Sequence, residues 1–396
     1  MNRDTAVLLR ALYRGALAAV DPRRSVADAL SRRDVAAALA GARQIGVFAA
    51  GKAAAGMFRA GWRPGREGLV VLPRGYVAPA ARAGVRILYA AHPEPDVSSV
   101  RAARAAVAFF SGFGAEDLVL CLLSGGSSSL LCLPRAGITL PQKRRDVRRL
   151  VRAGASIEQV NRLRTSLSAI KGGKLGRTTP ARLVTLLISD VPGDRPSLIG
   201  SGPTIRNRPG DVTRVVASNE AGLAGAARVA RRFGLDPLTR RARLEGEARE
   251  VGRCLGREVA RVPEGQVLLA GGETTVTLGR VHGLGGRNLE VALAAAEELE
   301  GLAGAALLAA GSDGRDGSSR AAGAVVDGST ITRARRSGLD PARALARHDT
   351  EPFFERAGGL LRTGPTGTNV ADWAFGIRVH RTGKEKRETG REKRPR

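Results

Sequence analysis

The 396-residue chain contains few of the residues that build disulfide-rich, zinc-binding or membrane proteins. Its three cysteines, Cys121, Cys132 and Cys254, are too few and too far apart for a disulfide scaffold or a CxxC zinc site. Its four histidines share no metal-ligand spacing, and no apolar run approaches the roughly 20 residues that span a bilayer. The apolar N-terminal stretch is interrupted by Arg10 and Arg14, which favours a surface helix over a signal peptide. We therefore expect a cytoplasmic protein that uses no membrane partner.

Aromatic residues and lysines are also scarce. Aromatic residues make up 4% of the chain, and the formal net charge of +27 comes almost entirely from arginine. Such a charge is typical of nucleic-acid-binding proteins, but the chain has few aromatic platforms on which bases could stack. The arginine excess extends over the whole chain together with alanine and glycine. The charge is therefore weak evidence for nucleic acid, and attraction of small anionic substrates or a solvated surface explains it as well.

Short apolar runs alternate with helical patterns along the chain, which predicts an α/β fold with a mostly parallel sheet. The expected strands are 44–50, 68–72, 85–90, 117–123, 183–189, 266–270 and 304–310. The expected helices are 98–111, 142–153, 156–171, 219–233, 245–260 and 288–300. A charge-rich stretch at 231–265 suggests a domain boundary. We divide the chain into domains at 1–240 and 241–380, followed by a disordered basic tail at 381–396.

Five of the expected strands end in turns of glycine and polar residues. Because ligands bind at the carboxyl ends of strands in open α/β sheets, we expect these turns to form one rim of an active site. The turn Ser124–Gly125–Gly126–Ser127 precedes a helix and offers N–H groups and hydroxyls that suit a phosphate or a carboxylate. Lys52 could neutralise a transferring phosphoryl group. The alternative interpretation is that these are ordinary tight turns.

Two nucleotide-binding signatures are incomplete. Residues 46–52 fit G-x-x-x-x-G-K, but the next residue is Ala53, so the Mg²⁺-binding hydroxyl of a P-loop is missing. No G-x-G-x-x-G follows the first strand, which disfavours a dinucleotide-dependent dehydrogenase. We therefore reject the P-loop interpretation and retain the lysine as a candidate.

Carboxylates cluster in the other turns. Asp190 and Asp194 follow one strand, and Asp313 and Asp316 follow another. Their oxygens suit Mg²⁺, and one of them could accept a proton from a hydroxyl nucleophile, although an aspartate at such a position also caps helices. Further candidates for substrate or nucleotide contacts are Glu273, Arg287 and Asn288, and Thr368 and Asn369 in a loop rich in glycine and hydroxyl groups.

Ten motifs follow one another along the chain. They are GKAAAGM (51–57), HPEPD (92–96), LLSGGSSSLL (122–131), GASIEQVNRLRTSLSAIKGGKL (154–175), ISDVPGDRPSLIGSGPT (188–204), ASN (217–219), GGETTVT (271–277), GGRNLE (285–290), SDGRDGSSRAAGAVVDG (312–328) and TGPTGTNVADW (363–373). With these motifs in this order, the chain resembles the MOFRL-type glycerate 2-kinases from about residue 5 to residue 375. That family includes proteins labelled as hydroxypyruvate reductases.

The resemblance implies two α/β/α domains, one with a Rossmann-like parallel sheet and a smaller one with a mixed sheet, and an active site in the interdomain cleft. It implies phosphorylation of D-glycerate to 2-phosphoglycerate with ATP and Mg²⁺ or another divalent cation. Lys52 and Arg287 match the family's proposed catalytic lysine and arginine, and Lys171 lies in its IKGGKL motif. The oligomeric state stays open between a monomer and a homodimer.

The expected site then has three groups of residues. Lys52, Arg287 and Asp190 are catalytic, with Asp190 as the base and Asp313 as the next choice. The nucleotide or substrate contacts are Ser124, Gly125, Gly126, Ser127, Lys171, Glu273, Asn288, Thr368 and Asn369. The metal ligands are Asp194, Asp313 and Asp316.

The chain departs from the family at Thr165–Ser166, where Lys-His is usual, at Ser312 and at Arg195. The first change removes two candidate phosphate contacts and puts full activity in question. Two other functions stay open: a hydroxypyruvate reductase and a basic nucleic-acid-binding protein.

Overall fold

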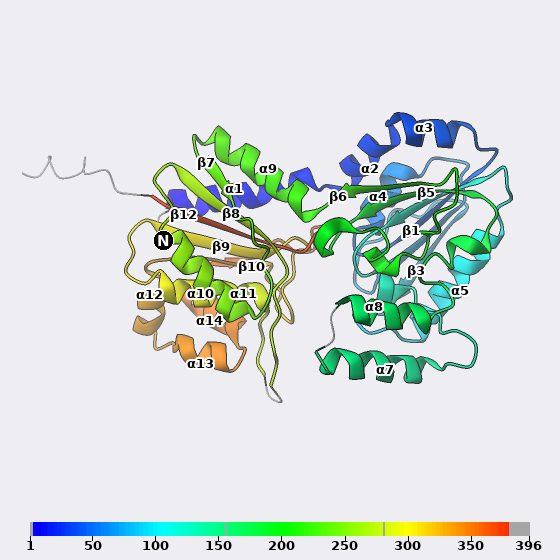
Figure 1. Ribbon diagram of the computed structural model, residues 1–396. Helices are drawn as coiled ribbons and strands as arrows, with labels where there is room; N and C mark the ends of the chain where they lie inside the picture. The colour runs from blue at the N-terminus through cyan, green and yellow to red at the C-terminus, as the bar shows by residue number, and fades with distance from the viewer. Residues whose placement is uncertain (1–2, 155–156, 280–281, 380–396) are drawn as a thin grey trace, which may run out of the picture.

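The computed structural model describes residues 3–154, 157–279 and 282–379, so the predicted tail at 381–396 lies outside the described residues. Two six-stranded sheets form two lobes that lie side by side (Figure 1). In the part of the chain that is described, every helix is too short or too polar to cross a bilayer.

The first sheet is entirely parallel, with the order β3-β2-β1-β4-β5-β6. Its strands are β1 (Ile45–Ala50), β2 (Gly68–Pro73), β3 (Val85–Ala90), β4 (Leu118–Leu123), β5 (Arg182–Ile188) and β6 (Val212–Ala217). The central strands are apolar throughout because both faces of the sheet are covered. In β1, Val47 and Ala49 point into one core, and Phe48 and Ala50 point into the other.

The second sheet is mixed, with the order β11-β10-β9-β12-β8-β7. Its strands are β7 (Asp236–Thr239), β8 (Gln266–Gly272), β9 (Ala305–Gly311), β10 (Gly323–Asp327), β11 (Leu360–Leu361) and β12 (Asp372–Arg378). β12 runs antiparallel between β8 and β9, and its first residue, Asp372, pairs with both Gly272 and Gly311. The start of β12 therefore lies between the carboxyl ends of β8 and β9.

Helices cover both faces of each sheet, so the predicted pair of α/β/α layers is confirmed. The α-helices are α1 (Arg3–Ala19), α2 (Pro22–Leu30), α3 (Arg33–Ala40), α4 (Ala54–Gly61), α5 (Val97–Ser111), α6 (Ser127–Leu130), α7 (Leu140–Arg152), α8 (Ile157–Ser166), α9 (Asn219–Arg232), α10 (Ala248–Val259), α11 (Arg287–Glu298), α12 (Thr330–Arg336), α13 (Pro341–Ala346) and α14 (Thr350–Ala357). Short 3₁₀ helices span η1 (Gly176–Thr178), η2 (Pro192–Asp194) and η3 (Ile199–Ser201).

The spatial division does not follow a single cut at residue 240. Helix α1 packs on β9 and β12, α9 packs on β8, and β7 pairs with β8, so three elements from before residue 240 lie with the second sheet. The cause is the apolar face of α1, whose Leu9, Leu12 and Tyr13 are fully buried. Figure 1 shows α1 and α9 on the lobe of the second sheet, apart from α2 and α3.

Candidate active site

The turn that carries Lys52 is joined to the turn that carries Ser124. The backbone N–H of Lys52 donates to the carbonyl of Gly125 over 2.9 Å, and the Ser124 hydroxyl accepts from the N–H of Ala53 over 3.0 Å. Gly51 has a φ of +127°, and a Cβ on it would lie 2.2 Å from the Ser124 Oγ, so only glycine fits between the two turns. Ser124 therefore holds the lysine turn in place with its side chain.

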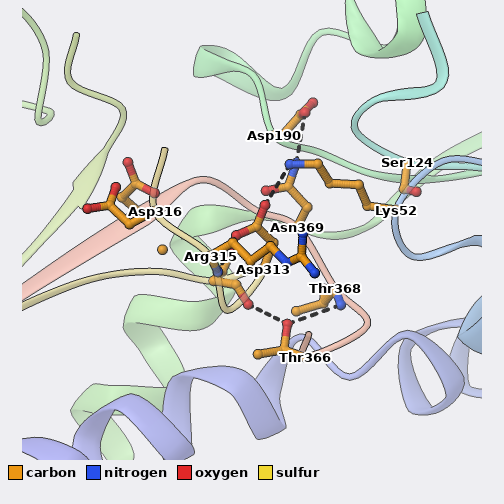
Figure 2. A network of polar contacts seen from close by, with 12 residues as sticks. Lys52, Ser124, Asp190, Asp313, Arg315, Asp316, Thr366, Thr368 and Asn369 are labelled. Carbon is orange, nitrogen blue, oxygen red and sulfur yellow. Dashed lines mark hydrogen bonds and ion pairs between the residues drawn. The ribbon is translucent and has the colours of Figure 1, made fainter. Parts of the chain in front are cut away.

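Lys52 connects the two lobes. Its Nζ lies 2.6 Å from Oδ2 of Asp313, which follows β9 of the second sheet (Figure 2). Burial lowers the pKa of Lys52, but the charge and hydrogen bond of Asp313 outweigh it, so the net pKa lies above the usual value. Lys52 is therefore a charged, largely buried cation at the junction of the lobes.

Asp190 lies beside this ion pair. Its Oδ2 accepts a hydrogen bond of 3.1 Å from Nδ2 of Asn369, which again joins the first sheet to the second (Figure 2). Burial raises the pKa of Asp190 to about 6, against the opposing charge of Lys52. A carboxylate that is poised near neutral pH and faces a cation suits a general base.

Gly125 makes room for this pair. A Cβ on Gly125 would lie 2.0 Å from Asp190 Oδ2 and 2.5 Å from Asn369 Nδ2. We expect Gly125→Ala to displace the side chains of Asp190 and Asn369. The kcat/KM of the expected glycerate phosphorylation should then fall by about 100-fold, as it does when a reacting group is misplaced by about 1 Å. Steady-state kinetics with a matched Gly279→Ala control, where a Cβ meets nothing within 4 Å, would check this. If both variants have the same kinetics, the positions of Asp190 and Asn369 do not matter for the reaction.

Arg287 lies at the start of α11 among carboxylates. Its Nε and Nη2 donate to Asp372 over 2.5 and 3.2 Å, and its Nη1 lies 2.6 Å from Oε1 of Glu273. Burial lowers the Arg287 pKa, but the charges of Asp372 and Glu273 raise it overall. Desolvation raises the pKa of Glu273 to about 7, against the charge of Arg287. Glu273 is also the more exposed of the two carboxylates on Arg287, so an anionic ligand could take its place there.

Three of the expected site residues, Asp316, Asn288 and Thr368, form hydrogen bonds within the protein itself. Both Asp316 oxygens accept hydrogen bonds at the start of α11, from the N–H groups of Asn288 and Leu289 over 3.0 and 2.8 Å and from the Asn288 amide over 3.2 Å. Thr368 donates to the carbonyl of Val20 over 3.1 Å. Asp316 therefore stabilises the start of α11, a helix that precedes it in the chain, whereas the helix-capping alternative concerned a helix that follows the aspartate.

Ser127 and Lys171 are likewise buried. Lys171 donates to the Ser128 carbonyl over 2.6 Å and also to the Ser128 hydroxyl. Burial, followed by the charge of Lys143, lowers the pKa of Lys171 to about 7. Within the described chain the Ser127 hydroxyl has no hydrogen-bond partner, and it faces Gly200 at close range. Lys171 therefore supports the Ser124–Ser127 turn through Ser128, the residue that follows it.

The three expected metal ligands are not gathered into one cluster. Asp313 contacts Lys52, Asp316 caps α11, and Asp194 lies in the separate turn η2 with a left-handed φ of 50°. Across residues 3–379, apart from the undescribed gaps, no group of three or more histidine, cysteine, aspartate or glutamate side chains could hold a metal ion. The expected single rim is also two rims, since three of the turns follow strands of the first sheet and two follow strands of the second.

His92 is a neighbour of the site that the sequence did not single out. Its Cδ2 and Nε2 lie 3.1 Å from where a Cβ on Gly126 would stand, beside the Lys52 side chain. Burial, followed by the charge of Lys52, lowers the pKa of His92 to about 4, so the ring is neutral at pH 7. The sequence signal that could have identified His92 was the HPEPD motif.

Thr165 and Ser166, where the chain departs from the family, make contacts near their own helix. The Thr165 carbonyl accepts a hydrogen bond from Lys174, and the Ser166 hydroxyl donates one to the Leu163 carbonyl.

Two family models match successive parts of the chain. Residues 8–231 match the domain of unknown function DUF4147, and residues 266–372 match the MOFRL family. A protein of Agrobacterium vitis with a provisional hydroxypyruvate reductase name is 39% identical, over 92% of this chain and 92% of that protein. The glycerate 2-kinase of Pyrococcus horikoshii is 33% identical, over 93% of this chain and 96% of that protein.

A solved structure agrees with these matches. The crystal structure of a glycerate kinase from Thermotoga maritima has a TM-score of 0.83 and 32% identity, and it covers 95% of this chain and 100% of that chain. The match extends over both lobes, so the arrangement of the two sheets is shared. The chain therefore belongs to the family of proteins that join a DUF4147 domain to a MOFRL domain.

Proposed function

We propose that this protein transfers the γ-phosphoryl group of ATP to the C2 hydroxyl of D-glycerate, giving 2-phosphoglycerate and ADP. The observation that carries the proposal is the convergence of Lys52, Asp313 and Asp190 from both lobes of a chain similar along its length to proteins named glycerate kinase. Phosphoryl transfer needs positioning and charge neutralisation more than covalent chemistry, and this arrangement supplies both.

Each group has a role in the proposed step. The C2 oxygen forms a bond to the γ-phosphorus while the bond from that phosphorus to the bridging oxygen of ADP breaks. Asp190 accepts the hydroxyl proton, and Lys52 exchanges Asp313 for the charged oxygens of the transferring group. Arg287 exchanges Glu273 for the glycerate carboxylate. The N–H group of the half-buried Gly126 is assigned to contact phosphate, because Ser124, Gly125 and Ser127 are buried.

A divalent cation such as Mg²⁺ fits this site only as a companion of ATP. Mg²⁺ is commonly held by one or two carboxylates together with substrate phosphates, and the described residues offer isolated carboxylates instead of a cluster. Asp313 could complete its coordination, whereas both oxygens of Asp316 are already used by α11 and Asp194 lies in the separate turn η2. The ion would neutralise phosphate charge.

A coupled assay tests the function. Purified protein, D-glycerate, ATP and Mg²⁺ are mixed with enolase and its coupling enzymes, without phosphoglycerate mutase. We expect phosphoenolpyruvate to form, because enolase accepts 2-phosphoglycerate directly. ADP release without that signal would contradict the C2 assignment, and no ADP with glycerate would contradict the kinase. NADH or NADPH oxidation with hydroxypyruvate would support the reductase alternative instead.

A further inference from the structure

A groove between the two lobes lies apart from the candidate active site, and none of the candidate site residues lines it. It has a volume of about 570 Å³, which is the size of a small-molecule site. Its walls come from α1 and α9, which pack on the second sheet, and from α2 and β6 of the first lobe. Figure 1 shows these elements where the two lobes adjoin. An occupant would contact both lobes at once.

The walls of the groove are strongly basic. Four arginines line it, Arg24, Arg32, Arg228 and Arg232, against a single acid, Asp28. Asp28 pairs only with Arg24, over 3.7 Å and at an exposed position, where ion pairs contribute little. The guanidinium groups of the other three arginines have no hydrogen-bond or ion-pair partner among the residues that the structure describes.

The arginines stand on two opposing sides. Arg228 and Arg232 are four residues apart on α9 and so share one face of that helix. Arg24 and Arg32 belong to α2 and the residues directly after it. The apolar residues Val215, Val216 and Val229 also line the groove. One guanidinium fork binds two phosphate oxygens, so Arg228 and Arg232 together can take one phosphate, and either Arg24 or Arg32, which stand at opposite ends of α2, can take the other.

We propose that this groove binds a small organic molecule with two phosphate groups, such as a diphosphate, and that the occupant regulates the enzyme. The apolar lining residues would contact the organic part, and arginines from both sides of the groove would contact the phosphates. This ligand site does not depend on the proposed kinase activity, although its regulatory effect does.

The groove is linked to the candidate active site through α1. Tyr13 of α1 donates a 2.7 Å hydrogen bond to the carbonyl of Gly311, directly before the turn that holds Asp313. The carbonyl of Val20, just after α1, accepts a hydrogen bond from Thr368, the neighbour of Asn369. On the other side, α2 packs on α4, which follows Lys52. A ligand that fixes α1 against α2 therefore fixes the two halves of the site relative to each other.

Calorimetric titration of the full chain with inorganic pyrophosphate at 0.15 M salt tests the binding. The Lys52→Ala background weakens the catalytic site, so that binding there does not mask the groove. We expect saturable binding that weakens at least tenfold in the Arg228→Gln/Arg232→Gln double variant. Arg231→Gln removes one positive charge from α9 outside the groove and should leave the affinity within about twofold.

The other outcomes overturn the proposal. No binding, or equal affinity in the double variant, would exclude the groove as the site. Equal weakening by Arg231→Gln would show general attraction to a basic surface, and a short oligonucleotide that binds far more tightly through the same arginines would favour nucleic acid. The same titrations with ADP show whether the groove prefers a free diphosphate or a nucleotide. For each ligand, only the affinity that is lost in the double variant is assigned to the groove. If the site binds but steady-state KM and kcat stay unchanged, the regulatory role fails.

Discussion

We expect Lys52→Ala to lower kcat for glycerate phosphorylation by about 100- to 1000-fold. The reason is that, in the proposed step, Lys52 places a buried, protonated ammonium group where charge develops on the transferring phosphoryl group, and removing one such donor costs about this much. Its contact with Asp313 keeps it charged before ATP arrives. Steady-state kinetics of the purified variant in the coupled assay would measure the loss.

The control removes a positive charge elsewhere in the same lobe. Arg104 is exposed on α5, and Arg104→Ala should leave kcat within about twofold. Thermal unfolding of Lys52→Ala would show whether the uncompensated Asp313 carboxylate destabilises the fold. A folded Lys52→Ala protein with normal turnover would remove Lys52 from the chemistry and leave the ion pair as a structural link between lobes.

The sequence predicted the parallel sheet well because its strands are buried on both faces. Continuous apolar runs such as Leu118–Leu123 are typical of strands in a parallel sheet that is covered on both faces. The second sheet was harder to predict. Its strands β7, β10 and β11 were not predicted, and neither was β6 at the edge of the parallel sheet. The central strand β12 of the second sheet, which contains Gly376, was missed as well. That glycine is needed because a Cβ there would lie 2.1 Å from Val259 of α10, which is a constraint set by packing. The helix predicted at 156–171 ends at Ser166, shortly before Gly172 and Gly173, which adopt left-handed φ values.

The candidate site was predicted as a set of residues, and their individual contacts were not. Lys52, Asp190, Asp313 and Asn369 lie together as the strand-end turns suggested. However, the hydroxyl of Thr368 bonds the carbonyl of Val20, 348 residues earlier in the chain. Such a pairing depends on how α1 crosses to the second sheet, and no local pattern of glycine and hydroxyl residues contains that information. Whether a polar residue binds ligand or backbone is decided by these distant contacts.

The pH dependence of kcat/KM tests the assignment of Asp190 as the base. A base must be deprotonated to accept the hydroxyl proton, and burial raises the Asp190 pKa to about 6. We therefore expect kcat/KM to be constant well above pH 6 and to fall about tenfold per pH unit well below it. Asp190→Asn should lower kcat by about 100- to 10,000-fold and abolish this acidic limb, since the amide cannot accept the proton.

Glu273→Gln separates this interpretation from the second titrating carboxyl group. Glu273 has a pKa of about 7 and contacts Arg287, so its replacement should change KM for glycerate but keep the fall in kcat/KM near pH 6. Suppose instead that Glu273→Gln removes the acidic limb and Asp190→Asn retains it. The titrating group is then Glu273, the partner of Arg287, and glycerate binding rather than proton transfer sets the pH dependence of kcat/KM. If only Asp313→Asn removes it, the base is on the second sheet, and Lys52 would then have to release its counter-ion before the proton could be transferred.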